Sequence, residues 1–369
     1  MSALLLNFEF SLPLLSSYQQ WFLCTRVLLL VRYYLSAKGI GELRILKGKM
    51  RHSALYFHQA CFDGIVSATL ARVTLENEGW AFTKFIPVGY EVRRKWPKQA
   101  LSSPAAVVDF LYHKQADFWA DHHPTAFLTP SLRRHFLARR ERQCLFYDDR
   151  AGSCAGLLWR ALLGRIPCPD RYRDAVQWAE KIDTAHYASV DEAIWGSSPA
   201  LKIRQSLMMN ADLDYHVYLL TQMESGDLQH IAQRPPVRDR YQEMNRRISA
   251  GLERVKSEAS LDGDVAVIET HSSDRDIVSR YAPYYYFPKA RYSVAALRSD
   301  SGIRITAMRN PWMDFKSIPI GKLLEKFGGG GHERVGSVLI PHDSAKAHQI
   351  VNVLTREMQS HPPTERDSR

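Results

Sequence analysis

Over the first half of the chain, short apolar stretches that end at polar residues alternate with stretches of helical spacing. Residues 54–57 are apolar and lead into His58, and residues 118–120 lead into Asp121. A third stretch, 105–109, ends in a carboxylate. Strands that alternate with helices favour an open, mainly parallel α/β sheet, because parallel neighbours need a crossover connection. Ligands bind beyond the carboxyl ends of such strands, so we expect a site at this edge.

The second half of the chain predicts a helical segment followed by a smaller α/β unit. Residues 170–260 carry helical periodicity, which Pro235-Pro236 breaks. Strand-like stretches begin at residue 265, and residues 292–297 and 303–307 predict a hairpin. We predict five segments: an N-terminal extension (1–49), a first α/β domain (50–190), a helical segment and linker (191–260), a smaller C-terminal α/β domain (261–345), and a C-terminal helix and tail (346–369).

The first 49 residues are rich in Leu, Phe and Tyr but hold no membrane span. Glu9, Arg26 and Arg32 interrupt the apolar runs before they reach the ~18 residues that a span needs. A secretory signal begins with basic residues, whereas the first one here is Arg26. Three explanations stay open: a membrane-surface anchor, a divergent leader, or translated sequence upstream of a start at Met50. We favour the last and expect residues 1–49 to be dispensable for function.

The net charge and the cysteines indicate the class of partner and the compartment. The formal net charge is +10, which favours anionic partners such as nucleotides or nucleic acid. The five cysteines include no CxxC pair, so neither a disulfide framework nor a structural zinc site is expected. A reduced, cytoplasmic compartment is predicted.

Seven acidic and imidazole side chains follow the expected strands and helices: His58, Asp63, Asp109, Asp121, His122, His123 and Asp183. Carboxylate oxygens suit hard divalent cations, and imidazole adds affinity for Mn²⁺ or Zn²⁺ over Mg²⁺. Two neighbouring ions need a shared carboxylate, and Asp109 is the natural bridge because it closes a strand that looks central. Such a pair of ions can activate water and hold phosphoryl oxygens during in-line attack.

These residues lie in motifs that resemble those of the DHH phosphoesterases. The signature is Asp121-His122-His123-Pro124-Thr125, and three further metal motifs occur in the family's order: His58-Gln59-Ala60-Cys61-Phe62-Asp63-Gly64, Val107-Val108-Asp109 and Lys181-Ile182-Asp183. Leu297-Arg298-Ser299 and the glycine box 328–332 resemble the DHH-associated C-terminal domain. The resemblance covers residues 54–341 and implies a parallel-sheet DHH domain and a substrate-binding domain, joined by a helical linker. The family includes RecJ-type exonucleases, nano-RNases, cyclic-dinucleotide phosphodiesterases and manganese pyrophosphatases.

By position, the resemblance implies a role for each motif residue. One metal ion would be held by His58 and Asp109, and the other by Asp63, Asp109, His122 and Asp183. His123 would contact the scissile phosphate, and Asp121 would orient a histidine. The cofactors would be two divalent ions, with Mn²⁺ favoured over Mg²⁺ or Zn²⁺. Substrate phosphate would be bound by Arg298, Gly329, Gly330, Gly331 and His332.

Cys61 departs from the family pattern, because many members carry an acidic residue at this place. A thiolate can ligate Zn²⁺ or Mn²⁺, whereas a neutral thiol would leave the first metal ion short of a ligand. A metal role for Cys61 therefore stays open, and with it the occupancy of the first metal position.

We predict a metal-dependent phosphoesterase that hydrolyses phosphodiester bonds of short oligonucleotides or dinucleotides by a two-metal mechanism. A RecJ-like single-strand exonuclease is one alternative, although no additional nucleic-acid-binding domain is evident. A non-catalytic nucleotide-binding sensor is another, if Cys61 disables the site. The partner is a short nucleic acid or nucleotide, with no stable membrane span, and a homodimer is left open. Tyr284-Tyr285-Tyr286-Phe287 is interpreted as core rather than as a platform for bases.

Overall fold

The computed structural model describes residues 51–209, 212–271 and 277–361. Residues 50–369 form one compact unit, so the strands and helices of these ranges belong together. The expectations about residues 1–49, including the start at Met50, lie outside the described residues. None of the helices in the described ranges combines the length and the apolarity that crossing a bilayer requires.

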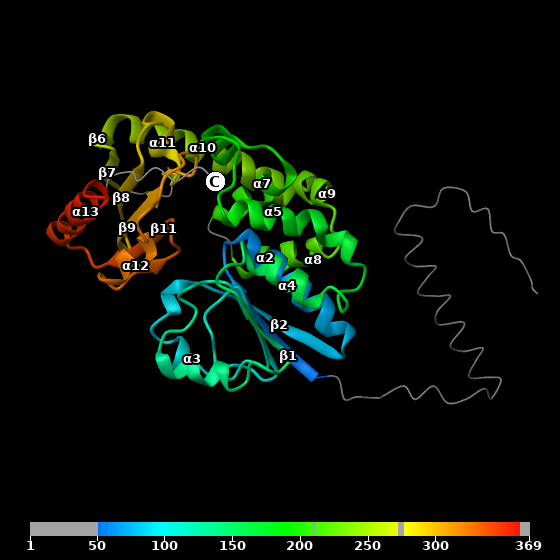
Figure 1. Cartoon of the computed structure of the whole chain (residues 1–369). Coiled ribbons are helices and arrows are strands. Elements are labelled where there is room, and N and C mark those ends of the chain that lie inside the picture. Colours follow the sequence, from blue (N-terminus) through cyan, green and yellow to red (C-terminus); the bar gives the residue numbers. More distant parts are fainter. Residues whose placement is uncertain (1–50, 210–211, 272–276, 362–369) are drawn as a thin grey trace, which may run out of the picture. The chain divides into compact units, whose positions relative to one another are not determined.

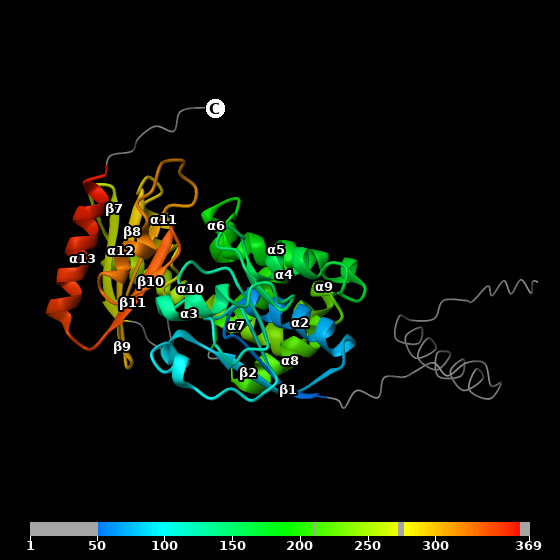
Figure 2. The ribbon, with the colours of Figure 1, turned by 60° about the horizontal axis from the view of Figure 1, so that its bottom comes forward.

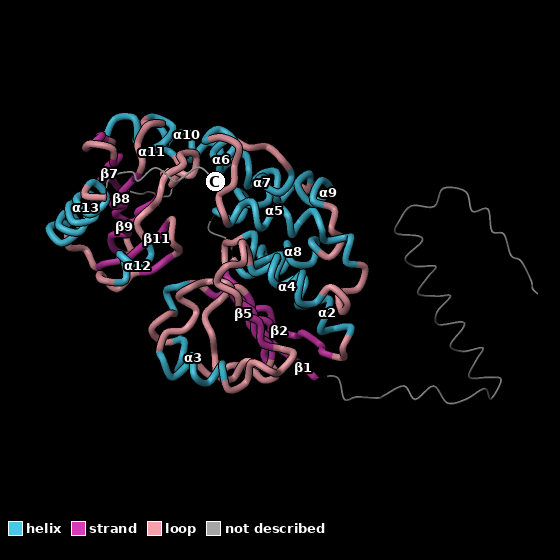
Figure 3. The backbone as a smooth tube through the Cα atoms, viewed as in Figure 1, coloured by secondary structure: helices cyan, strands magenta, loops and turns pink. Residues whose placement is uncertain are grey.

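A sheet of five parallel strands forms the first lobe, in the order β2-β1-β3-β4-β5. Figure 3 shows its strands in magenta below the helices. Its central strands are buried on both faces, as expected where helices and loops cover a parallel sheet. This explains why they read as continuous apolar runs. The strands are β1 (Arg51–His58), β2 (Trp80–Val88), β3 (Ala105–Val108), β4 (Phe118–Asp121) and β5 (Leu145–Tyr147).

Helices pack on one face of this sheet, and loops with a short helix cover the other (Figure 1). On the helical face, the sheet packs against α2 (Phe62–Asn77), α4 (Cys154–Leu162), α5 (Arg173–Asp183) and α8 (Leu213–Met223) in one hydrophobic core. On the other face, the indoles of Trp96 and Trp119 are fully buried and donate to the carbonyls of Leu111 and Phe110, at 2.9 and 2.8 Å. These bonds fix the chain directly after β3, where one site residue lies.

The remaining helices of this half follow α5 or cover the loops between strands. The break expected at Pro235-Pro236 falls between two helices, and the prolines begin the second of them. Proline suits the first helical positions because no backbone donor is needed there. The elements are α3 (Pro130–Leu137), α6 (Val190–Trp195), α7 (Pro199–Met208), α9 (Leu228–Gln233) and α10 (Pro235–Glu258), with short 3-10 helices at Tyr90–Val92, Trp96–Lys98 and Pro169–Tyr172.

The second lobe is a mixed six-stranded sheet in the order β10-β11-β9-β8-β7-β6. Only β7 and β8 run parallel, and β8 and β9 form the expected hairpin. Two helices, α12 (Ile320–Glu325) and α13 (Ser344–Gln359), pack on one face, and Figure 2 shows α13 alongside the sheet. The other elements are β6 (Ser260–Asp262), β7 (Val265–His271), α11 (Ala282–Tyr286), β8 (Tyr292–Ser299), β9 (Gly302–Arg309), β10 (Gly330–Gly331) and β11 (Val335–Ile340). The predicted fold class, α/β with a parallel-sheet lobe, a helical connection and a smaller C-terminal lobe, is confirmed.

Gly64 lets α2 start against the end of β1. A Cβ atom on Gly64 would lie 2.3 Å from the carbonyl oxygen of His58, and backbone cannot yield there without moving the helix. We expect Gly64→Ala to lower the free energy of unfolding by about 1–3 kcal/mol, measured by urea unfolding. Gly164→Ala is the matched control, because nothing lies within 4 Å of its added Cβ. Equal losses in the two variants would contradict this account.

Candidate active site

Imidazole and carboxylate groups converge at the carboxyl edge of the parallel sheet. His122 is the centre: its Nε2 atom lies 3.2 Å from an oxygen of Asp183 and 3.7 Å from oxygens of both Asp63 and Asp109. These residues come from the ends of β3 and β4, the start of α2 and the end of α5. The structure therefore brings together four of the five predicted metal ligands around one ring nitrogen.

The fifth predicted ligand approaches the other side of Asp109. The Nδ1 atom of His58 lies 3.4 Å from Oδ2 of Asp109, while Oδ1 of Asp109 faces His122. Donor atoms of His58, Cys61 and Asp109 lie within 4.8 Å of one another, as do those of Asp63, Asp109 and His122. The two groups share Asp109. Together with their neighbours they form the His/Asp cluster, which consists of the side chains of His58, Cys61, Asp63, Asp109, Asp121, His122, His123 and Asp183.

Several polar atoms of the cluster are buried without a hydrogen-bond partner in the described part of the chain: His58 Nδ1, Asp109 Oδ1, Asp109 Oδ2 and Asp121 Oδ2. A buried polar atom without a partner costs about 1–3 kcal/mol, so several in one place call for a ligand. Carboxylate oxygens with imidazole nitrogens are a donor set for hard to borderline divalent cations. The residues present therefore suit divalent metal ions.

The two histidines of the DHH signature are oriented by different partners. His122 Nδ1 lies 3.1 Å from the carbonyl oxygen of Ala151, to which it can only donate, and this leaves Nε2 as a lone-pair donor toward the cluster. His123 Nδ1 lies 2.7 Å from Oδ1 of Asp121, and the same oxygen accepts the backbone N–H groups of both histidines. Asp121 thus holds the turn and orients His123 at once.

Asp63 is fixed by the beginning of helix α4. Its two carboxylate oxygens accept the backbone N–H groups of Cys154 and Ala155, both at 2.8 Å. The N-terminus of a helix offers free N–H groups and a partial positive charge, so it holds a carboxylate well. No sequence pattern indicates that the first turn of α4 binds Asp63.

The other two aspartates are Asp109, which is oriented by its backbone conformation, and Asp183, which is placed by the end of a helix. Asp109 has φ of 55°, a left-handed conformation that Asp tolerates better than most residues. Its N–H donates to the carbonyl of Ala120, which ties it to β4. Asp183 is the last residue of α5, so it lies at the C-terminal end of a helix.

Burial and neighbouring charges shift the pKa values of several groups in the cluster. Burial and the charges of Asp109 and Asp183 raise the pKa of Asp63 and hold the pKa of the Cys61 thiol well above its usual value. Burial would lower the pKa of His122, but its hydrogen bond with Asp183 and that carboxylate's charge raise it well above its usual value. Without a metal ion, therefore, Cys61 is a neutral thiol and His122 carries a proton.

The glycine box of the second lobe brings His332 to the two signature histidines. The ring centroid of His332 lies 4.8 Å from that of His123 and 5.4 Å from that of His122. Burial and the charge of His123 lower the pKa of His332 to about 4, so it is neutral at physiological pH. Gly331 has φ of +149°, and a Cβ there would lie 2.3 Å from a carbonyl oxygen of Val335. Glycine is thus required next to His332.

The other predicted phosphate-binding residues differ in their contacts: Gly329, Gly330 and Arg298. The N–H of Gly329 donates to the carbonyl of Leu324, so it is engaged within the lobe rather than free for an anion. Arg298 lies on β8 with its guanidinium 4.0 Å from Glu269, and its Nε is buried without a hydrogen-bond partner in the described part of the chain. A phosphate role for Gly329, Gly330 and Arg298 stays a prediction.

Two residues beside the cluster were not singled out from the sequence. Tyr90, on the 3-10 helix after β2, has its ring 5.2 Å from that of His58. Arg93 has Nη1 3.3 Å from the position that a Cβ on Gly330 would take. A lone tyrosine and an arginine within a basic stretch carry no sequence signal of a site.

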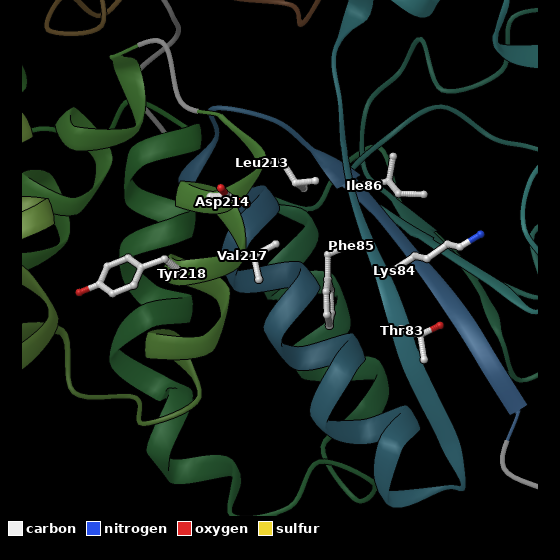
Figure 4. Close-up of a pocket in the computed structure, with 8 residues that line it drawn as sticks. All are labelled: Thr83, Lys84, Phe85, Ile86, Leu213, Asp214, Val217 and Tyr218. Carbon is white, nitrogen blue, oxygen red and sulfur yellow. The ribbon is translucent and has the colours of Figure 1, made fainter.

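A groove elsewhere on the first lobe lies between the outer strand β2 and helix α8 (Figure 4). Phe85, Leu213 and Val217 give it an apolar lining, and its charged residues are Lys84 and Asp214. It contains no residue of the His/Asp cluster and no group of converging ligands, so it is not the candidate active site.

Comparisons with known proteins give matches only in structure: no family model and no curated sequence match. The pGpG-specific phosphodiesterase PggH from Vibrio cholerae aligns with a TM-score of 0.60 and 16% identity, over 84% of this chain and 99% of that one. RecJ from Thermus thermophilus, in complex with Mn²⁺, aligns with a TM-score of 0.52 and 16% identity, over 86% of this chain and 53% of that one. This chain thus spans about half of RecJ. At such identities the likeness establishes a shared fold.

Metal binding should release protons, because a cation ligated by His122 Nε2 displaces the proton that Asp183 stabilises there. The pKa of His122 is raised, so the proton is present at neutral pH and is lost as pH rises. The apparent affinity for Mn²⁺ should therefore increase with pH around neutrality. Titration calorimetry at pH 7 in buffers of different ionisation enthalpy should show net proton release. An affinity that does not change with pH, without proton release, would count against this site.

Proposed function

From the premise that the chain has the fold of the DHH phosphoesterases, we propose that it is a metal-dependent phosphoesterase. It hydrolyses phosphodiester bonds of short oligonucleotides or dinucleotides, with two divalent cations, Mn²⁺ before Mg²⁺ or Zn²⁺. The observation that carries the proposal is the position of Asp109, whose two oxygens are both buried, both without hydrogen-bond partners in the described chain, and directed toward two different groups of ligands.

The two groups correspond to two cation positions. His58, Cys61 and Asp109 form one, and Asp109 with Asp63, His122 and Asp183 forms the other. Divalent cations bound there would acidify water and neutralise phosphoryl oxygens in the transition state. The chain's own part is to fix these ligands: the amides of α4 hold Asp63, and the carbonyl of Ala151 fixes the ring of His122.

His123 would contact the scissile phosphate. Its Nδ1 is engaged by Asp121, so its Nε2 is the nitrogen that remains for the substrate. The charge of Asp121 raises the pKa of His123 although burial opposes it, so the ring can carry a positive charge toward a phosphate oxygen. His332, close to His123, Gly331 and Arg298 would complete phosphate binding from the second lobe.

The likeness to the pGpG-specific phosphodiesterase supports short substrates over long single strands. The alignment spans 99% of that phosphodiesterase and 53% of RecJ. A RecJ-like single-strand exonuclease is therefore the second candidate. A non-catalytic sensor is the third: if Cys61 kept its proton beside the first cation, only His58 and Asp109 of this group would ligate it.

A substrate panel with Mn²⁺ tests the proposal. We expect turnover of linear dinucleotides or very short oligonucleotides, exceeding that of pyrophosphate and of long single strands. Asp109→Ala should lower kcat at least about a thousandfold, since it removes the ligand common to both cations. Asp239→Ala is the matched control, an exposed aspartate outside the cluster that pairs with its neighbour Arg238. Calorimetry on Asp109→Ala should show Mn²⁺ binding weakened or lost.

The alternatives give different outcomes in the same panel. Faster degradation of long single strands than of dinucleotides would favour the exonuclease. Dinucleotide binding without turnover, at every divalent metal tested, would favour the sensor. Undiminished turnover in Asp109→Ala would contradict the two-cation arrangement itself.

A further inference from the structure

We propose that Tyr90 is a nucleobase-binding residue, on which a base next to the scissile phosphate stacks. The inference rests on the proposed function and deepens it: it specifies a substrate that carries a base, not a bare chain of phosphates. Nothing in the sequence motifs assigns a role to this residue.

Tyr90 combines exposure with closeness to the His/Asp cluster. Its ring centroid lies 5.2 Å from that of His58 and 6.2 Å from that of His123. The residue is nevertheless 37% exposed, and few large apolar residues in the described chain are as exposed. A phosphate between the cations and His123 would have its sugar and base within reach of this ring.

The Tyr90 ring has a rigid backing of aromatic side chains. Its centroid lies 5.4 Å from that of Phe110, which is fully buried and directly follows Asp109. Phe110 in turn packs edge-on against buried Trp96, at 5.0 Å between centroids. The residue that supports the ring thus neighbours the shared metal ligand, so the platform and the cations keep a fixed separation.

Hydrogen bonds also hold the backbone around Tyr90 in place. The N–H of Gln59, next to His58, donates to the carbonyl of Val88, and the Gln59 amide donates to Glu91 at 3.3 Å. The N–H of Arg93 donates to the carbonyl of Tyr90 itself. A platform ordered before the ligand binds loses less conformational entropy on binding, which favours a recognition role.

Stacking accounts for this position better than phosphate binding does. A site for anions alone gains from cations and N–H donors, whereas an exposed aromatic ring contributes nothing to binding a phosphate chain. Stacking of a base on an aromatic side chain contributes ~1–3 kcal/mol and tolerates any base. The hydroxyl is the one group of Tyr90 that could bind phosphate instead, and removing it separates the two roles.

Kinetics on three variants test the inference. Tyr90→Ala should raise KM for a linear dinucleotide about tenfold or more with little change in kcat. Tyr90→Phe keeps the ring and should behave as the unmodified protein, while Tyr90→Leu keeps bulk but not stacking and should resemble Tyr90→Ala. Tyr285→Ala is the control, an exposed tyrosine of similar exposure (40%) elsewhere; its KM should not change.

Dinucleotides that lack one base locate the contact. One analogue lacks the 5′ base and the other lacks the 3′ base. The analogue that lacks the stacking base should bind the unmodified protein and Tyr90→Ala with the same affinity. If Tyr90→Ala leaves KM unchanged for every substrate, or Tyr90→Phe matches Tyr90→Ala, the inference is overturned. If no dinucleotide is hydrolysed at all, the proposed function fails. The role of Tyr90 is then decided by calorimetric Kd values for the dinucleotide. An unchanged Kd in Tyr90→Ala overturns the inference about Tyr90.

Discussion

Crowding of carboxylates around Asp109 is the constraint on which the rest of this site depends. Asp63, Asp109 and Asp183 come within reach of one imidazole; Asp63 and Asp109 are almost fully buried, and Asp183 is partly exposed. Their mutual repulsion, added to burial, raises the pKa of Asp63 and of the Cys61 thiol. A single protonated His122 offsets only part of this charge. Divalent cations would relieve it, because each one brings two positive charges to oxygens that have no other partner.

The fold supplies this crowding through parallel strands and then holds it with backbone groups. Parallel strands bring their carboxyl ends to one edge, so His58, Asp109 and Asp121 come together although they are far apart in sequence. Helix α4 directs its first amides at Asp63, and a carbonyl fixes His122. These are rigid elements, so the ligands are positioned before any ion or substrate binds.

The sequence predicts the frame of the molecule better than its contacts. Buried parallel strands produce continuous apolar runs, and polar residues directly after them mark the strand ends, so β3 and β4 and their aspartates could be foreseen. The hydrogen bonds of Asp63 could not be foreseen, because backbone amides at the start of a helix leave no pattern in the sequence. Tyr90 was not singled out, because its proposed role depends on its exposure and on its closeness to His58, and the sequence shows neither. The surroundings of Arg298 depend on which neighbouring strand offers Glu269, which no local pattern specifies.

The central claim is that the two oxygens of Asp109 serve two different cations. A crystal structure of the protein grown with Mn²⁺, with diffraction data collected at the manganese edge, tests it most directly. We predict two anomalous peaks a few ångströms apart on either side of Asp109, one beside His58 and Cys61, the other among Asp63, His122 and Asp183. A cluster without anomalous density at saturating Mn²⁺, or ions bound elsewhere with Asp109 uninvolved, would contradict the account.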